Sequence, residues 1–477
     1  MLEIRDVIII FASIYKRRKM YYRRIIDSYL KEWSERSTHK PVLLRGARQV
    51  GKSTAVRHLA ESFDNFVEIN FERHPEYIHL FKENLDVRRI VSQMEALSGQ
   101  NITPGKTLLF FDEIQFCKEA IMSLRFFKED MAELHVVAAG SLLEFALTEL
   151  PSFGIGRIHS MFMYPMTFDE FLQANGEDAL LKLRNNSDAE HPLPIPLYDK
   201  MIGLLRTYML VGGMPEVVAK WVETHDYLQC QEIQDDIVVG YEDDFPKYSS
   251  RVNPQLLRQT LRSVATQCSR KFVYSEVGAY RSEEVKKALD LLILAGICVP
   301  VTKTSGNGLP LGGESDNSYR KILILDCGLL MRLLNMSLGN VSELTALILT
   351  GDEMDLVNKG PMGEMIAGLE MIRYKSPNIR HELYYWQRTA KNSLAEVDYM
   401  SEHNIKVLPI EVKAGVKGGM KSLWIFMREK NLNLGVRCSL ENFGKFTYTD
   451  NLADDALRQV VICPLFAMSM LQKLLSD

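Results

Sequence analysis

The chain has 477 residues, of which 46% are hydrophobic and 25% are charged, and its formal net charge is −4. These values are ordinary for a folded, soluble protein, and the length is too great for one hydrophobic core and indicates about three domains. Because the net charge is slightly negative, a globally basic surface is excluded, and any nucleic-acid surface must be a local patch.

The cysteines and the N-terminal residues indicate in which cellular compartment the protein is expected. The seven cysteines are widely scattered and include no C-x-x-C pair, which argues against a zinc site or a disulfide framework and indicates a reducing cytoplasm. Residues 7–14 are apolar, but a membrane-spanning helix needs roughly 20 such residues, and a signal peptide has its basic residues before the apolar run, not after it. We therefore expect no membrane anchor, and we interpret residues 1–19 as a translational extension before Met20 or as a peripheral helix.

A phosphate-binding loop is predicted after an expected helix over 21–33 and a short apolar strand over 41–44. The loop fits the pattern G-x-x-x-x-G-K-[ST], and its glycines let backbone N–H groups turn inward toward an anion. Lys52 is placed to reach the β- and γ-phosphates, and the Ser53 hydroxyl is placed to hold Mg²⁺. ATP and Mg²⁺ are therefore the expected ligands, and the expected nucleotide-binding residues here are Gly46, Gly51, Lys52, Ser53 and Thr54.

Further strands are predicted over 66–71, 107–113 and 135–141, with a charged helical region at 75–97. The second of these strands is apolar and ends in two acids. Asp112 is expected beside Ser53, where it binds Mg²⁺ through the water shell, and Glu113 is placed to polarise the attacking water. The last strand ends in Ser141, which we interpret either as a sensor of the γ-phosphate or as a helix N-cap.

These stretches resemble the AAA+ class of P-loop ATPases, and more narrowly the bacterial and archaeal members with a C-terminal domain of unknown function called DUF4143. The resemblance covers nearly the whole chain from Met20 onward, and the stretches that carry it are 46–53, 108–115, 140–141, 156–157, 164–171, 212–216 and 321–329. It implies an ATPase with an arginine that offsets charge on the γ-phosphate. Arg157 is the candidate, and a surface or salt-bridging arginine is the alternative. Arg48 is disfavoured because it occupies a variable position of the loop.

The middle of the chain is expected to be largely helical. Residues 168–248 read as the helical lid of the ATPase running into a connecting bundle, with an amphipathic helix over 201–210 and a polar loop over 185–196. The order strand, helix, strand at 271–277, 282–294 and 297–301 is that of a winged helix. The helix at 282–294 carries charges of both signs, which favours protein packing over DNA binding. Residues 305–318 are expected to form a flexible loop.

A second group of acids with a lysine lies in the last part of the chain. A helix is predicted over 360–370 and strands over 382–388, 395–400 and 407–413. If the last two strands are antiparallel neighbours, Asp398, Glu411 and Lys413 converge, and Glu364 can join them from the helix. This arrangement resembles the PD-(D/E)xK nuclease core, which implies Mg²⁺ at Glu364, Asp398 and Glu411 and a catalytic Lys413. A solvated strand face, or a nuclease-like fold without catalysis, is the alternative.

The expected fold class is α/β, with a P-loop AAA+ ATPase core, a helical lid, a winged-helix-like middle domain and an α/β nuclease-like C-terminal domain. The expected divisions are 1–19 for the extension, 20–165 for the ATPase, 166–250 for the lid and connector, 251–335 for the winged-helix-like part of DUF4143 and 336–477 for the nuclease-like domain. Two hypotheses about function remain. In the first, ATP hydrolysis gates cleavage of DNA or RNA. In the second, ATP drives a switch that recruits a protein partner or self-associates, and the C-terminal domain only binds.

Overall fold

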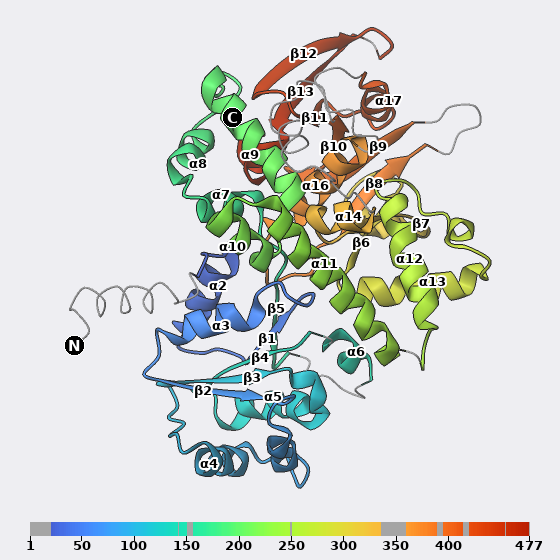
Figure 1. The fold of residues 1–477 in the computed structure, drawn as a ribbon. Coiled ribbons are helices and arrows are strands. Elements are labelled where there is room, and N and C mark those ends of the chain that lie inside the picture. The colour runs from blue at the N-terminus through green and yellow to red at the C-terminus, as the bar shows by residue number, and fades with distance from the viewer. Residues whose placement is uncertain are drawn as a thin grey trace, which may run out of the picture.

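The computed structural model contains two α/β lobes with a layer of helices between them (Figure 1). The residues that it describes are 21–141, 143–149, 156–248, 250–334, 359–388, 395–413, 419–453 and 455–476. The predicted N-terminal extension and the choice between Met1 and Met20 lie outside these residues. Over the described ranges, no helix combines the length and the apolar character that crossing a membrane requires.

The first lobe is built on a sheet of five parallel strands in the order β2-β3-β4-β1-β5. The strands are β1 (Val42–Arg45), β2 (Asn65–Asn70), β3 (Thr107–Asp112), β4 (His135–Ala139) and β5 (His159–Phe162). Every residue of β3 and β4 is buried, as expected for a parallel sheet covered on both faces. The helices of this lobe are α2 (Ile25–Ser34), α3 (Lys52–Ala60), α4 (Val87–Ser98), α5 (Lys118–Asp130) and α6 (Leu143–Thr148), with 3-10 turns η1 (Pro75–Phe81) and η2 (Ile114–Phe116).

This arrangement is an α/β fold with a parallel sheet core of the P-loop ATPase type. The carboxyl ends of β1, β3 and β4 meet at one edge of the sheet, so the loops that follow these strands lie together. The four strands predicted from the sequence in this lobe are confirmed. The short strand β5 was not predicted, because four residues with only β1 as a hydrogen-bonded neighbour carry little periodic signal.

Helices follow the first lobe, as predicted for 168–248. They are α7 (Phe168–Ala174), α8 (Asp178–Asn185), α9 (Ile195–Val211), α10 (Pro215–Thr224), α11 (Tyr227–Asp244) and the turn η3 (Phe245–Tyr248). Thr167 begins α7 with a capping box, because its hydroxyl accepts from the Glu170 N–H and the Glu170 carboxylate accepts from the Thr167 N–H. In Figure 1, α10 and α11 lie between the two lobes, and α9 runs along the second lobe.

The second lobe holds one eight-stranded mixed sheet in the order β12-β13-β11-β10-β9-β8-β6-β7. The strands are β6 (Cys298–Thr304), β7 (Ser315–Ile324), β8 (Leu383–Gln387), β9 (Glu396–His403), β10 (Lys406–Lys413), β11 (Leu434–Ser439), β12 (Gly444–Asp450) and β13 (Ala456–Pro464). The helices are α12 (Pro254–Thr266), α13 (Ser282–Leu294), α14 (Cys327–Leu333), α16 (Lys359–Arg373), α17 (Lys421–Glu429) and α18 (Leu471–Leu474), with turns η4 (Tyr274–Val277), η5 (Leu311–Glu314) and η6 (Leu465–Met470). Because β6 pairs with β8, this sheet runs across the predicted division at residue 335.

Two local predictions in this lobe are wrong. The strand expected over 271–277 is reduced to an isolated bridge between Lys271 and Lys321, and the residues after it form the turn η4. The flexible loop expected over 305–318 contains the turn η5, and β7 already begins at Ser315. Pairing with β6 extends β7 through polar residues whose composition alone is typical of a loop.

Buried polar contacts hold the second lobe together and join it to the helical layer. The Arg373 guanidinium donates to the carbonyl oxygen of Met166 at 3.2 Å, to the hydroxyl of Tyr208 at 2.7 Å and to the carbonyl oxygen of Leu325 at 2.6 Å. The Gly213 N–H donates to the Asp326 carboxylate at 2.6 Å. One apolar core also extends from β1 through α9 into the second sheet, so the lobes are packed against each other.

A stacked histidine pair lies where the segment before β1 meets the start of β4. The rings of His39 and His135 are 3.9 Å apart, and the indole of Trp33 contacts both rings edge-on. The Nε2 atom of His135 lies 3.0 Å from the carbonyl oxygen of Ser34, and that of His39 lies 3.3 Å from the carbonyl oxygen of Leu134. Burial lowers the pKa of both rings, and with the charge of His39 it lowers the pKa of His135 to about 4.

We expect this pair to make the first lobe sensitive to acid. An unfolded histidine takes up a proton near pH 6.5 and the buried His135 does so only near 4, so the free energy of unfolding should fall as pH decreases between these values. Urea unfolding at pH 7 and pH 5 measures this loss. The double variant His39→Gln/His135→Gln keeps N–H donors but cannot titrate, so it should lose less stability than the wild type. An equal loss in both proteins would contradict the prediction.

Candidate functional site

The loop between β1 and α3 has the backbone conformation of a phosphate cradle. Gly46 has φ +149°, and a Cβ atom there would lie 2.1 Å from the carbonyl oxygen of Met163, so no other residue fits. Gln49 has φ 65°, an uncommon conformation for a residue with a side chain. Gly51 begins α3 with no side-chain cap, which leaves the N–H groups of the first turn without a capping partner. This helix end therefore favours an anion.

Lys52 is folded against this loop. Its Nζ donates to the carbonyl oxygens of Gly46 at 2.9 Å and Ala47 at 2.7 Å, and the side chain is buried. An ammonium has three N–H donors, so one remains for a phosphate oxygen. Burial lowers the pKa of Lys52 to about 8, and the nearby charges of Glu113 and Asp112 act in the opposite direction.

Ser53 and Asp112 lie side by side, as the sequence predicted. The Ser53 hydroxyl donates to the Asp112 carboxylate at 3.0 Å, and the Asn70 side chain donates to the other oxygen of that carboxylate at 3.3 Å. Burial raises the pKa of Asp112, and the hydrogen bond from Ser53 opposes this. A hydroxyl and a carboxylate are the hard oxygen ligands that Mg²⁺ prefers, so these residues fit the ion.

Glu113 is held in place by Gln115 in the turn directly after it and by Ser141 in the loop after β4. Its carboxylate accepts from the Ser141 hydroxyl at 3.1 Å, from the Ser141 N–H at 3.3 Å and from the Gln115 amide at 2.6 Å. A Cβ atom at Gly140 would lie 2.0 Å from the Gln115 side-chain oxygen, so this glycine leaves room for Gln115. The structure thus brings Glu113 and Ser141 together. Ser141 was interpreted as a γ-phosphate sensor or a helix N-cap, and neither interpretation included this contact.

Arg157 lies in a surface ion pair. Its Nε atom is 3.0 Å from the Glu129 carboxylate, and 56% of its side chain is exposed. This placement is the salt-bridging alternative considered for it. The role of Arg157 at the γ-phosphate stays a prediction.

Three segments distant in the sequence contact the phosphate loop, and sequence analysis missed all of them. Arg24, before α2, donates to the carbonyl oxygen of Val50 at 2.9 Å. The hydroxyl of Tyr241, on α11, donates to the carbonyl oxygen of Arg48 at 3.0 Å. Gly296, between α13 and β6, packs so closely that a Cβ atom there would lie 3.3 Å from the nitrogen of Ala47. No local pattern marks these residues, because only tertiary packing brings them to the loop.

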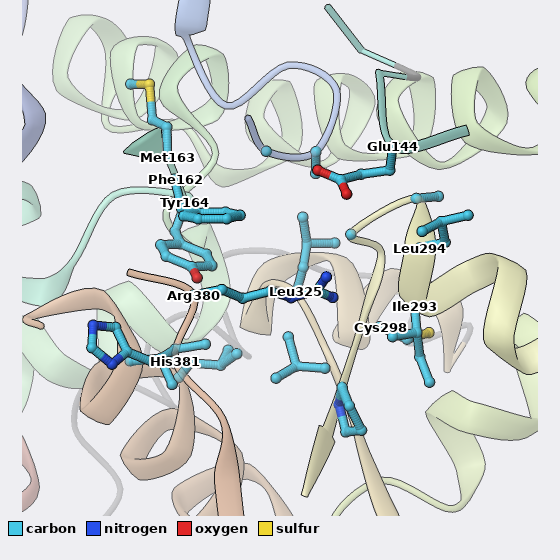
Figure 2. A pocket seen from close by; sticks show the side chains of 18 of the residues that line it. Glu144, Phe162, Met163, Tyr164, Ile293, Leu294, Cys298, Leu325, Arg380 and His381 are labelled. Carbon is cyan, nitrogen blue, oxygen red and sulfur yellow. The ribbon is translucent and has the colours of Figure 1, made fainter. Parts of the chain in front are cut away.

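A cavity of about 290 Å³ adjoins the start of the phosphate loop, between the two lobes. Figure 2 shows Glu144 and Tyr164 of the first lobe facing Leu325 and Arg380 of the second lobe across this space, with Arg380 reaching into it. The two lobes therefore enclose one side of the loop together.

The C-terminal acids also converge, but around a lysine that sequence analysis did not assign to this group. Strands β9 and β10 are antiparallel neighbours, as predicted. The Lys321 ammonium, fully buried on β7, lies 2.7 Å from the Glu364 carboxylate, 2.6 Å from that of Glu396 and 3.7 Å from that of Asp398. Burial acts to lower the pKa of Lys321, but the charges of these three carboxylates raise it, so the ammonium stays charged.

The predicted metal set of Glu364, Asp398 and Glu411 lies beside two lysines. Lys321 is ion-paired to the first two carboxylates, and Lys413 lies 2.6 Å from the Glu411 carboxylate. Among the residues that the structure describes, no three His, Cys, Asp or Glu side chains are grouped so that they could hold a metal ion. Ammonium groups thus lie against the carboxylates of the predicted metal set, and the metal assignment itself stays a prediction.

Three family models match separate parts of the chain. A family described as AAA domain matches residues 38–172, the domain of unknown function DUF8612 matches 202–339, and the domain of unknown function DUF4143 matches 359–458. The fold and the match together define an AAA-type ATPase domain, which supports ATP binding. DUF4143 was expected from residue 251 onward, whereas the match to its model begins at residue 359; the expected division of the chain into domains stays a prediction.

Solved structures similar to this chain are distant from it. The Walker-type ATPase PABY2304 of Pyrococcus abyssi is 16% identical over 67% of this chain and 97% of that chain, with a TM-score of 0.44. PCH-2 of C. elegans is 12% identical over 43% of this chain and 65% of that chain, with a TM-score of 0.27. No curated protein matches the sequence.

Removing the Lys321 ammonium should destabilise the second lobe. In Lys321→Ala, three buried or half-buried carboxylates lose their shared cation, and breaking a buried ion pair from one side costs about 3–5 kcal/mol of the free energy of unfolding. Urea unfolding of this variant measures the loss, and Lys286→Ala, on the exposed face of α13, is the matched control. Restoration of stability by Glu364→Gln in the Lys321→Ala background would confirm the cause. An unfolding curve like that of the wild type would contradict it.

Proposed function

We propose that this chain is an Mg²⁺-dependent ATPase. The observation that carries the proposal is the 3.0 Å contact between Ser53 and Asp112, which brings a hydroxyl and a carboxylate together beside the phosphate loop. The AAA domain match over residues 38–172 supports the same assignment independently of the geometry. ATP is the expected ligand because the loop, its lysine and the magnesium pair together suit a triphosphate.

Each residue has a defined part in this proposal. Lys52 donates to the phosphates, and Ser53 and Asp112 hold Mg²⁺, which when bound neutralises charge on the phosphate oxygens. Glu113, oriented by Ser141 and Gln115, accepts a proton from the attacking water as the water oxygen bonds to the γ-phosphorus. The bond between the γ-phosphorus and the bridging oxygen then breaks, and ADP and inorganic phosphate leave.

Two variants should separate binding from hydrolysis. Lys52→Ala should abolish tight ATP binding, because it removes the ammonium that meets the β- and γ-phosphates. Glu113→Gln should bind ATP as the wild type does and hydrolyse it about 10²- to 10⁴-fold more slowly. Calorimetric titration with ATP and a phosphate-release assay measure these effects, with the surface variant Arg270→Ala as control. Unchanged affinity in Lys52→Ala would refute the assignment.

We further propose that nucleotide state controls the rest of the chain as a switch and that the nuclease-like C-terminal domain binds rather than cleaves. This second role is favoured by Lys321, whose ammonium lies among carboxylates that a PD-(D/E)xK nuclease would use for a divalent cation. The order of elements supports a winged-helix-like middle domain: helix α12 is followed by the bridge at Lys271, helix α13 and the hairpin of β6 and β7. On α13, Glu283 lies 3.4 Å from Lys287, and this mixed charge suits a protein partner better than DNA.

A nuclease assay tests this choice. Plasmid DNA and single-stranded RNA are incubated with the full chain, ATP, and Mg²⁺ or Mn²⁺, in parallel with Lys413→Ala. We expect equal and negligible cleavage by both proteins. Cleavage by the wild type that is lost in Lys413→Ala would instead establish the alternative, an ATP-gated nuclease acting on nucleic acid.

A further inference from the structure

Arg48 connects the phosphate loop to the end of α11. It is the third residue of the loop, and its guanidinium lies 2.6 Å from the carboxylate of Asp244, the last residue of α11. Asp244 is buried, and it also pairs with Lys247 at 2.7 Å. The Tyr241 hydroxyl donates to the carbonyl oxygen of Arg48, so α11 holds both the backbone and the side chain of this residue.

The charge of the Arg48 guanidinium also acts on the groups that flank the expected γ-phosphate. Partial burial acts to lower the pKa of Arg48, but the hydrogen bond to Asp244 and the charges of Asp244, Glu113 and Glu72 raise it. In turn, the charge of Arg48 acts to lower the pKa of Lys52. Arg48 is therefore within electrostatic range of both the phosphate-binding lysine and the carboxylate proposed to activate water.

Other arginines near the loop are less suited to a γ-phosphate. Arg373 is bonded to main-chain and side-chain oxygens between the lobes, and Arg320 lies 2.9 Å from Asp290. Arg380 has no ion pair with any residue that the structure describes and reaches from the second lobe into the cavity beside Gly46 and Ala47, so it is the alternative that the variant Arg380→Ala tests (Figure 2). Arg48 is part of the loop itself and has one carboxylate partner that a phosphate oxygen can replace.

We propose that Arg48 contacts the γ-phosphate of bound ATP from within the same chain and that it gives up its hydrogen bond to Asp244 to do so. This inference rests on the proposed ATPase function. A guanidinium in that position stabilises the charge that develops on the γ-phosphate oxygens during transfer to water. The exchange also releases the end of α11 when a triphosphate is bound and restores the Asp244 contact when ADP remains. Arg48 is then both a catalytic residue and the start of a signal to the helices between the lobes.

Steady-state hydrolysis and nucleotide affinity of the full chain test this proposal. Arg48→Ala should lower kcat about 10³-fold, as loss of an arginine at the γ-phosphate does in related phosphoryl transfers. It should weaken binding of the non-hydrolysable analogue AMP-PNP and leave the affinity for ADP unchanged, because ADP has no γ-phosphate. Arg48→Lys should recover only part of kcat, since a lysine lacks the planar fork.

Asp244→Asn distinguishes a catalytic arginine from a structural ion pair. It breaks the same pair but leaves Arg48 in place, so it should retain kcat and raise the affinity for AMP-PNP relative to ADP about fivefold. Lys247→Ala and Arg380→Ala are matched controls that remove a neighbouring cation and should hydrolyse ATP like the wild type. Equal losses of kcat in Arg48→Ala and Asp244→Asn would overturn the proposal.

Failure of this inference can be told apart from failure of the proposed function. If the wild type hydrolyses ATP in a Lys52-dependent manner and Arg48→Ala has the same kcat, only the role of Arg48 is refuted. If the wild type does not bind ATP, the ATPase assignment is refuted and the role of Arg48 with it.

Discussion

The short contact between Ser53 and Asp112 depends on the order of the strands in the first sheet. The phosphate loop follows β1 and Asp112 ends β3, and β4 lies between these two strands. Because α3 crosses back over β4 toward β3, Ser53 at its first turn reaches the carboxylate two strands away. The loop after β4 then carries Ser141 into the space between them, where it meets Glu113. One parallel topology thus positions all the groups of the proposed ATPase site.

The parts of this site that could be predicted from the sequence are those encoded by neighbouring residues. The glycine spacing of the loop and the apolar run ending in Asp112 and Glu113 are short-range patterns with a physical cause, and both were found. The contacts from Arg24, Tyr241 and Gly296 could not be predicted, since each comes from a separate helix or turn. For the same reason β5 was missed. Its four residues show no strand pattern, and it forms a strand because it pairs with β1.

Lys321 shows a second limit of sequence reasoning. It begins an apolar stretch on β7 that was used only for its family resemblance, and a lysine on a strand is ordinarily expected at the surface. Its burial makes sense only once Glu364 from α16 and Glu396 and Asp398 from β9 are in place around it. The acids themselves were predicted to converge, and they do. The lysine that pairs with these acids could not be predicted, because Lys321 lies far from all of them in the chain.

Buried charges also govern how a change at the nucleotide site can spread. Isolated charges in the interior are costly, so the ion pairs and hydrogen bonds of Arg373, Asp326 and Asp244 have few alternative arrangements. A segment held by such contacts shifts between discrete positions rather than deforming gradually. Contacts from α11 and from the turn before β6 both reach the phosphate loop, so a rearrangement of that loop must be accommodated in the helical layer and in the second lobe. By thermodynamic linkage, a partner that fixes α11 in one position must change the affinity for ATP by the same factor that ATP changes the affinity for the partner.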